Sequence, residues 1–158
     1  MGLDTSHGCW HGAYSAFSRW RCGIAKAAGV PLDLMQGYWE GPLPHAMEWA
    51  APREGGPICA DPNGPSLHRY IERVNEWLPI KWESLKPDAL HVLLDHSDCE
   101  GEIAAADCAP LANRLEELLL DLPDGDGGGH IGNWREKTQE FIDGLRLAAS
   151  LNEPVEFR

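Results

Sequence analysis

Apolar residues recur at helical spacing in four stretches of the chain. Between Gly12 and Ala28 nearly every third or fourth residue is apolar, and Gly29 followed by Pro31 forms a C-terminal stop signal. The same spacing predicts three further helices, over residues 66–78, 107–122 and 133–151. Pro110 is compatible with the third helix only within its first turn, because proline lacks the backbone N–H that a helix interior uses.

Two short segments read as strands. Leu90–Leu94 is an apolar run bounded by polar residues, which is typical of a buried strand. Near the end of the chain Val155 and Phe157 alternate with charged residues, as in an edge strand. The N-terminal residues up to His11 form an extended start with Leu3 as its apolar anchor. We therefore expect an α+β fold in which about four helices pack on a small sheet that includes Leu90–Leu94.

Glycine and proline are concentrated between residues 30 and 65. Twelve of them fall in this stretch, too many for a long regular element, so it is expected to be a loop region packed by its aromatic residues. A length of 158 residues fits one globular domain spanning 1–158.

The charge balance excludes some classes of partner. Lysine and arginine number 13 against 25 aspartates and glutamates, a net charge of −12, which repels phosphate backbones and argues against non-specific nucleic-acid binding. No apolar run approaches the roughly 18–20 residues of a membrane span, and no signal peptide is readable at the N-terminus. A cytoplasmic protein is expected. Five cysteines without CxxC spacing indicate neither a disulfide framework nor a zinc knuckle.

The N-terminal run before the first helix is one candidate binding site. Gly8 and Gly12 allow tight turns, the helix start presents unpaired N–H groups, and nearby arginines add positive charge, a combination that suits an anion such as phosphate. The candidate ligand-binding residues are Ser6, His7, His11, Tyr14, Arg19 and Arg21. The alternatives are a structural turn with satisfied histidines, and arginines paired with acidic neighbours at the surface.

The second candidate is the polar segment after Leu94, with His96, Ser97 and Asp98 as ligand-binding residues. Its spacing resembles a calcium-binding loop, but the first and last ligand positions are wrong, and the nearby His and Cys residues match no closed zinc site. Cys99 is a poor nucleophile candidate because flanking carboxylates raise a thiol pKa. We expect neither a metal nor a cofactor. The alternative is a turn in which Ser97 and Asp98 cap backbone N–H groups.

Three blocks together resemble a known group of proteins. They are GLD.SH with YSAFSRWR at 2–7 and 14–21, HSDCEGEI at 96–103, and FI.GL..AA..NE..EF at 141–157. This combination is similar to a family of small phage and prophage proteins to which no activity is assigned. The resemblance implies an accessory protein acting in the host cytoplasm, where such proteins often block host factors or remove host small molecules. It transfers no catalytic residue.

We consider three functions. In the first, the protein sequesters a small anionic, nucleotide-like ligand, such as a nucleotide-derived defence signal, with aromatic faces stacking a base and arginines holding phosphate. That function needs no catalytic residues, so an enzyme is not the first expectation. In the second, an acidic surface blocks a basic host protein. In the third, His96, Asp98 and Glu100 form a metal-assisted or acid–base hydrolase site. A homo-oligomer is left open.

Overall fold

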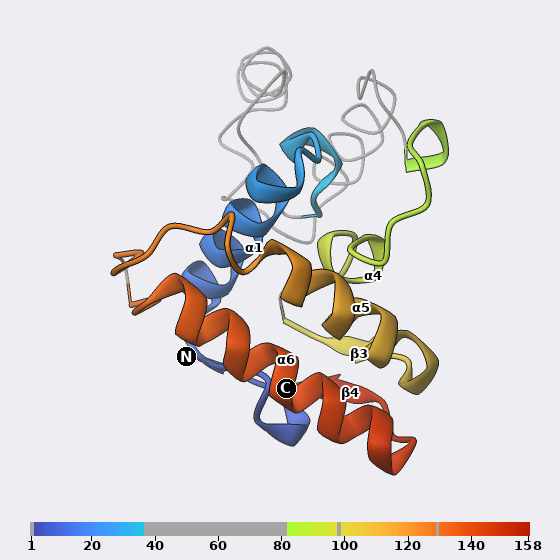
Figure 1. Cartoon of the computed structure of the whole chain (residues 1–158). Helices are drawn as coiled ribbons and strands as arrows, with labels where there is room; N and C mark the ends of the chain where they lie inside the picture. Colours follow the sequence, from blue (N-terminus) through green and yellow to red (C-terminus); the bar gives the residue numbers. More distant parts are fainter. Residues whose placement is uncertain (1, 37–81, 98, 129) are drawn as a thin grey trace, which may run out of the picture.

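The computed structural model describes residues 2–36, 82–97, 99–128 and 130–158 (Figure 1). The long helices are α1 (Tyr14–Ala28), α5 (Ala105–Leu118) and α6 (Trp134–Leu151). A short helix α4 (His91–Leu94) and the 3-10 turns Ser6–Gly8, Leu32–Leu34 and Trp82–Ser84 complete the helical part. The strands are β1 (Leu3–Asp4), β2 (His11–Gly12), β3 (Gly101–Ile103) and β4 (Val155–Phe157). The α+β class is confirmed; the helix expected over 66–78 and most of the 30–65 loop lie outside the described residues.

Helix α1 follows its predicted periodicity. Its inward face carries Phe17, Trp20 and Ile24, all fully buried. It ends at Gly29, whose φ of 69° lies in the left-handed region that glycine adopts without strain. None of the described helices is long and apolar enough to cross a membrane.

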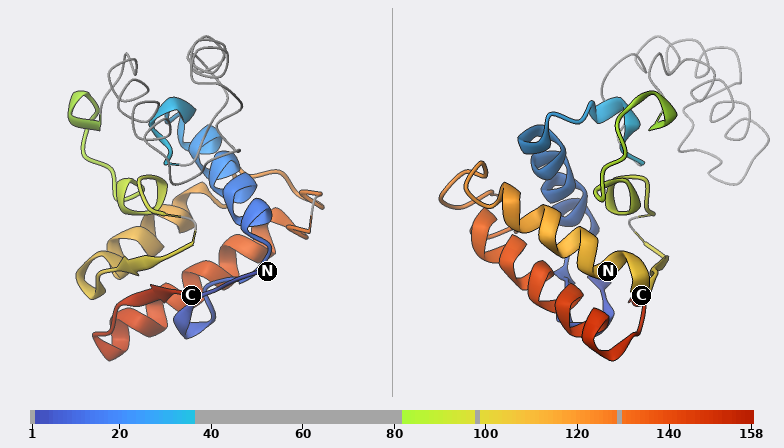
Figure 2. Two further views of the ribbon diagram at one scale, coloured as in Figure 1. Left: turned by 180° about the vertical axis from the view of Figure 1, so that it is seen from behind. Right: turned by 45° about the vertical axis from the view of Figure 1, so that its right-hand side comes forward.

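Helices α5 and α6 form an antiparallel pair that lies side by side in both views of Figure 2. Helix α6 begins where its sequence predicts, because the Asn133 side chain accepts hydrogen bonds from the N–H groups of Arg135 and Glu136. Helix α5 starts two residues earlier than expected and ends four residues earlier. Pro110 is therefore its sixth residue, beyond the first turn, which corrects the sequence expectation. It lies on the exposed side, where water can solvate the carbonyl left without a partner.

The prediction that Leu90–Leu94 is a strand is wrong. Residues 91–94 form the helix α4, with Leu90, Leu93 and Leu94 buried and His91 exposed. Burial at positions i, i+3 and i+4 is the helical pattern, and a run of five residues, four of them apolar, does not distinguish it from a strand.

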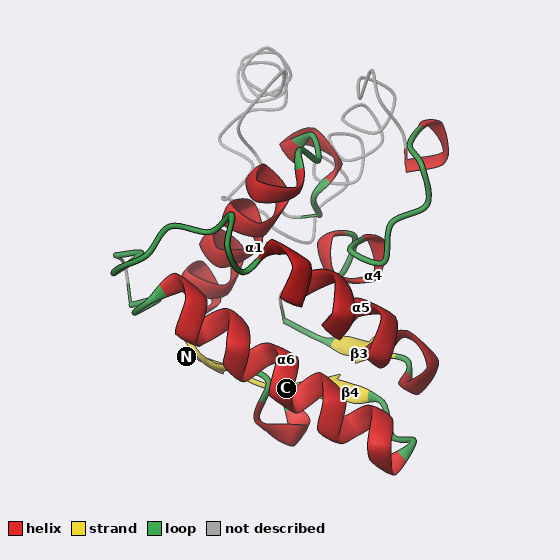
Figure 3. Cartoon of the chain, in the orientation of Figure 1, coloured by secondary structure: helices red, strands yellow, loops and turns green. Residues whose placement is uncertain are grey.

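The strands come from the two ends of the chain and from the segment before α5. β1 pairs with β2 and β3 pairs with β4, both antiparallel, and Figure 3 draws these short strands in yellow. The two strand pairs are joined because Asp4 and Arg158 exchange backbone hydrogen bonds of 3.0 and 2.8 Å, next to a bridge between Thr5 and Phe157. All three segments that carried the sequence resemblance therefore contribute to one small β layer, with Phe157 turned into the core.

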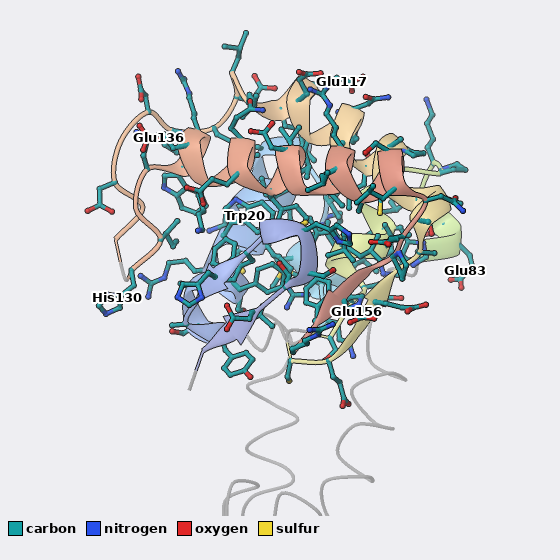
Figure 4. All side chains as sticks on the ribbon, turned by 90° about the horizontal axis from the view of Figure 1, so that it is seen from below. Trp20, Glu83, Glu117, His130, Glu136 and Glu156 are labelled. Atoms are coloured by element: carbon teal, nitrogen blue, oxygen red, sulfur yellow. The ribbon has the colours of Figure 1, made fainter. Side chains whose placement is uncertain are left out.

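An aromatic cluster fills the space between this layer and the helices. The rings of Trp10, Phe17, Trp20 and Phe141 lie with centroids 4.8–6.2 Å apart, and Trp20 occupies the centre of the molecule in Figure 4. The indole N–H of Trp20 donates to Thr138 Oγ1 at 2.9 Å, so this buried polar group is satisfied. Trp10 and Trp20 are thus core residues.

Candidate functional site

The N-terminal turn between β1 and β2 is closed by a threonine. Thr5 Oγ1 accepts a hydrogen bond from the backbone N–H of Trp10 at 2.6 Å and donates one to its carbonyl at 3.2 Å. Inside the closed turn His7 has a φ of 58°, in the left-handed region. That conformation costs a non-glycine residue about 1–3 kcal/mol, so surrounding contacts must hold it.

Those contacts connect three side chains. Ser6 Oγ lies 2.9 Å from His7 Nδ1, and His7 Nε2 lies 2.9 Å from Glu153 Oε2 just beyond α6. A carboxylate only accepts, so Nε2 carries a proton, and in the neutral ring Nδ1 then accepts from the Ser6 hydroxyl. The backbone N–H of Glu156 also donates to Ser6 Oγ at 2.9 Å. The turn is thereby fixed to the segment that leads into β4.

Cys9 packs the same turn closely against helix α6. A Cβ added at Gly144 of α6 would lie 2.5 Å from Cys9 Sγ, so the glycine permits a close approach between turn and helix. Burial raises the pKa of the Cys9 thiol to about 12, and burial also raises the pKa of Cys108. Both are therefore protonated packing residues at neutral pH, not nucleophiles.

The two histidines of the N-terminal run have different partners. His11 on β2 contacts Asp4 through its Nδ1, and both side chains are exposed, whereas only 11% of the His7 side chain is exposed and it faces Glu153. The left-handed turn between them removes the i, i+4 helical relation that would have aimed both at one metal ion.

The arginines of α1 also separate. Arg19 is exposed, whereas Arg21 is fully buried and donates to the carbonyl oxygens of His96 at 2.6 Å and Gln36 at 3.2 Å. The Arg21 guanidinium thus binds carbonyl groups inside the protein. Arg21 therefore adds no positive charge to the surface beside the N-terminal run, contrary to the expectation from the sequence. Tyr14 is half-buried and packs against the core at the start of the helix.

His96 and Ser97 occupy a turn over the end of β4. The His96 ring lies 4.2 Å from the Phe157 ring, and its Nδ1 lies 2.5 Å from the Ser97 carbonyl oxygen. Ser97 Oγ accepts the N–H of Cys99 at 3.2 Å, as in the capping-turn alternative. Asp98 lies outside the described residues, so a hydrolase site with Glu100 stays a prediction. Within the described ranges no His, Cys, Asp or Glu group is arranged to hold a metal.

The fold brings four of the predicted site residues together, in two separate groups. Ser6 and His7 meet Glu153 on one side of β4, while Arg21 and His96 meet through a backbone carbonyl near Phe157. Sequence reasoning missed Glu153 because 146 residues separate it from His7. Its only sequence signal is its place directly after the end of a strongly periodic helix.

The comparisons with known proteins leave the chain without an assigned relative. No protein-family model matches it, and neither a curated protein nor a solved structure shows significant similarity to it.

Proposed function

We propose that the protein binds a small anionic, nucleotide-like ligand on the exposed face of α1. The observation that carries this proposal is an uncompensated positive face. Helix α1 contains no aspartate or glutamate, and Arg19 and Lys26 are both exposed. Neither forms an ion pair with the described residues, whereas Arg114, Arg135, Lys137, Arg146 and Arg158 all do. An anion binding there displaces no internal partner.

The spacing of these cations favours one class of ligand. Arg19 and Lys26 are seven residues apart, which places them on the same side of the helix, about 10 Å apart along its axis. That distance suits a ligand with two anionic groups better than a single phosphate. In a protein with a charge of −12 such a ligand must bind through local contacts, because the overall field is screened beyond about 8 Å. In a phage-infected cell this binding would sequester a nucleotide-derived signal.

Titration calorimetry against mono-, di- and cyclic nucleotides tests the proposal. A hydrogen bond to a charged group contributes about 1.5–3 kcal/mol, so Arg19→Ala and Lys26→Ala should each weaken Kd by about 10–100-fold. Lys86→Ala is the matched control: Lys86 is also exposed and forms no ion pair with described residues, but it lies outside α1. Absence of binding by the parent protein, or equal affinities in all three variants, would overturn the proposal.

A second function, capture of a basic protein, has its own observation. Residues 116–143 contain eight carboxylates and only two cations, and both cations are already paired with carboxylates. Leu120 is 82% exposed within this stretch, and Glu117 and Glu136 project from the outer sides of α5 and α6 in Figure 4. Salt-sensitive capture of a host protein, lost in Leu120→Lys but retained in Arg19→Ala, would favour this function over nucleotide binding.

A further inference from the structure

The side chains of Ser6, His7 and Glu153 form a continuous chain of hydrogen bonds that the ligand-binding proposal does not use. We propose that Ser6 is a nucleophile for acyl transfer, with His7 as its general base and Glu153 as the residue that orients His7. The two bonds are both 2.9 Å, within the range expected between a nucleophile, its base and the group that orients the base. This site lies on the turn between β1 and β2, whereas the proposed anion site lies on α1.

The hydrogen-bond directions fit that assignment. Ser6 Oγ accepts the N–H of Glu156, so its single proton is free to be donated. His7 Nδ1, at 2.9 Å, is a better acceptor for that proton than the Pro154 carbonyl at 3.5 Å. The same Glu156 N–H stabilises negative charge as it develops on the oxygen, because hydrogen bonds to the charged form favour it.

The backbone conformation gives an independent reason to assign a function to this turn. His7 keeps a φ of 58° although the neighbouring Gly8, at 69°, is the residue type that adopts such angles without strain. Hydrogen bonds between Thr5 and Trp10 close the strained turn, and Cys9 packs closely against Gly144 of α6. Both contacts hold the turn in place. Strain retained by the surrounding structure is found most often at functional sites, where it fixes reacting groups in position.

The surroundings define the class of substrate. Glu153 is 58% exposed and Asp4 lies on the neighbouring strand, whereas Glu156 is paired with Arg158, so the carboxylates that remain make the site weakly acidic. An anionic phosphoester would be repelled, whereas an uncharged or cationic carboxylic ester would not. Ser6 is half-buried, so part of the residue is accessible to a small ester from solvent.

The reaction balances without a cofactor. Ser6 Oγ attacks the ester carbonyl carbon while its proton moves to His7 Nδ1, and Glu153 stabilises the imidazolium through Nε2–H. Collapse of the tetrahedral intermediate breaks the bond to the leaving alcohol, which takes the proton from Nδ1. Water, deprotonated by His7, then hydrolyses the Ser6 ester and returns the proton to the serine.

An uncharged alkyl fluorophosphonate tests the nucleophile directly. Ser6 Oγ would form a bond to phosphorus as fluoride leaves, and peptide mapping of the full-length protein would place the adduct on Ser6. His7→Gln should slow labelling by at least about 100-fold, the usual contribution of a general base. Glu153→Gln should lower the maximal rate of labelling and leave the half-saturating probe concentration unchanged, a split that a merely structural role would not produce.

Two control variants make the outcome decisive. Lys86→Ala, which removes an exposed cation outside both proposed sites, should label at the parent rate. Ser15→Ala removes an exposed hydroxyl elsewhere and should also label normally. If the parent protein carries no adduct on Ser6, or if folded His7→Gln is labelled as fast as the parent, the proposal is overturned. If His7→Gln does not fold, the peptide map of the labelled parent protein decides the question alone.

Discussion

Replacing Arg21 by alanine should destabilise the fold severely, whereas replacing Arg19 should not. The Arg21 side chain is 0% exposed, and its guanidinium donates to the carbonyl oxygens of His96 at 2.6 Å, Gln36 at 3.2 Å and Leu93 at 3.4 Å. It also lies 5.0 Å from the centre of the Phe17 ring. The side chain therefore ties α1 to the end of α4 and to residue 36, three places far apart in the sequence.

The expected loss follows from these bonds. Each hydrogen bond to a charged group contributes about 1.5–3 kcal/mol, and the two shorter bonds are well formed, so their removal should cost about 3–6 kcal/mol. The Leu93 carbonyl would remain buried without this donor, so water does not fully offset the loss there. With a urea m-value of about 2 kcal/mol/M, the unfolding midpoint should fall by roughly 1.5–3 M.

Urea unfolding followed by circular dichroism measures this difference. Arg19→Ala, the matched control on the same helix, should stay within about 0.5 kcal/mol of the parent because its side chain is exposed. Arg21→Met fills much of the same volume, so a similar loss in that variant would assign the effect to the hydrogen bonds and not to a cavity. Equal midpoints for Arg21→Ala and Arg19→Ala would refute the reasoning.

Three further outcomes are expected. Asn133→Ala should lower stability by about 1 kcal/mol in urea unfolding, because the side chain caps two N–H groups of α6; no change would mean that water replaces the cap. Gly144→Ala should lower the thermal midpoint by several degrees, because its Cβ would lie 2.8 Å from the Cys9 backbone nitrogen. Overpacking costs about 1–3 kcal/mol, more than the ~1 kcal/mol gained in helix propensity. A raised midpoint would contradict the close contact. The free energy of unfolding should fall as the pH rises from 9.0 towards about 12, because the unfolded Cys9 thiol ionises in that window while the folded thiol stays protonated. Cys9→Ala should flatten that part of the pH profile, and an unchanged slope would exclude Cys9 as its source.

The amino-acid sequence by itself determined the three long helices and the final strand. Helices α1, α5 and α6 each carry apolar residues at helical spacing over three turns or more, and Asn133 and Gly29 mark their ends by local chemistry. Such signals depend on residues within a few positions of one another, so they can be read before any tertiary contact is known.

Tertiary structure alone decided the features that depend on distant partners. The run Leu90–Leu94 is too short for its period to be read. It forms a helix that packs against α1, and Arg21 of α1 donates a hydrogen bond to its Leu93 carbonyl oxygen. The pairing of His7 with Glu153 and of Asp4 with Arg158 joins the two ends of the chain, which no local pattern encodes. Arg19 and Arg21 differ by only two positions, yet one faces water and the other the core, because two residues turn a helix by about 200°.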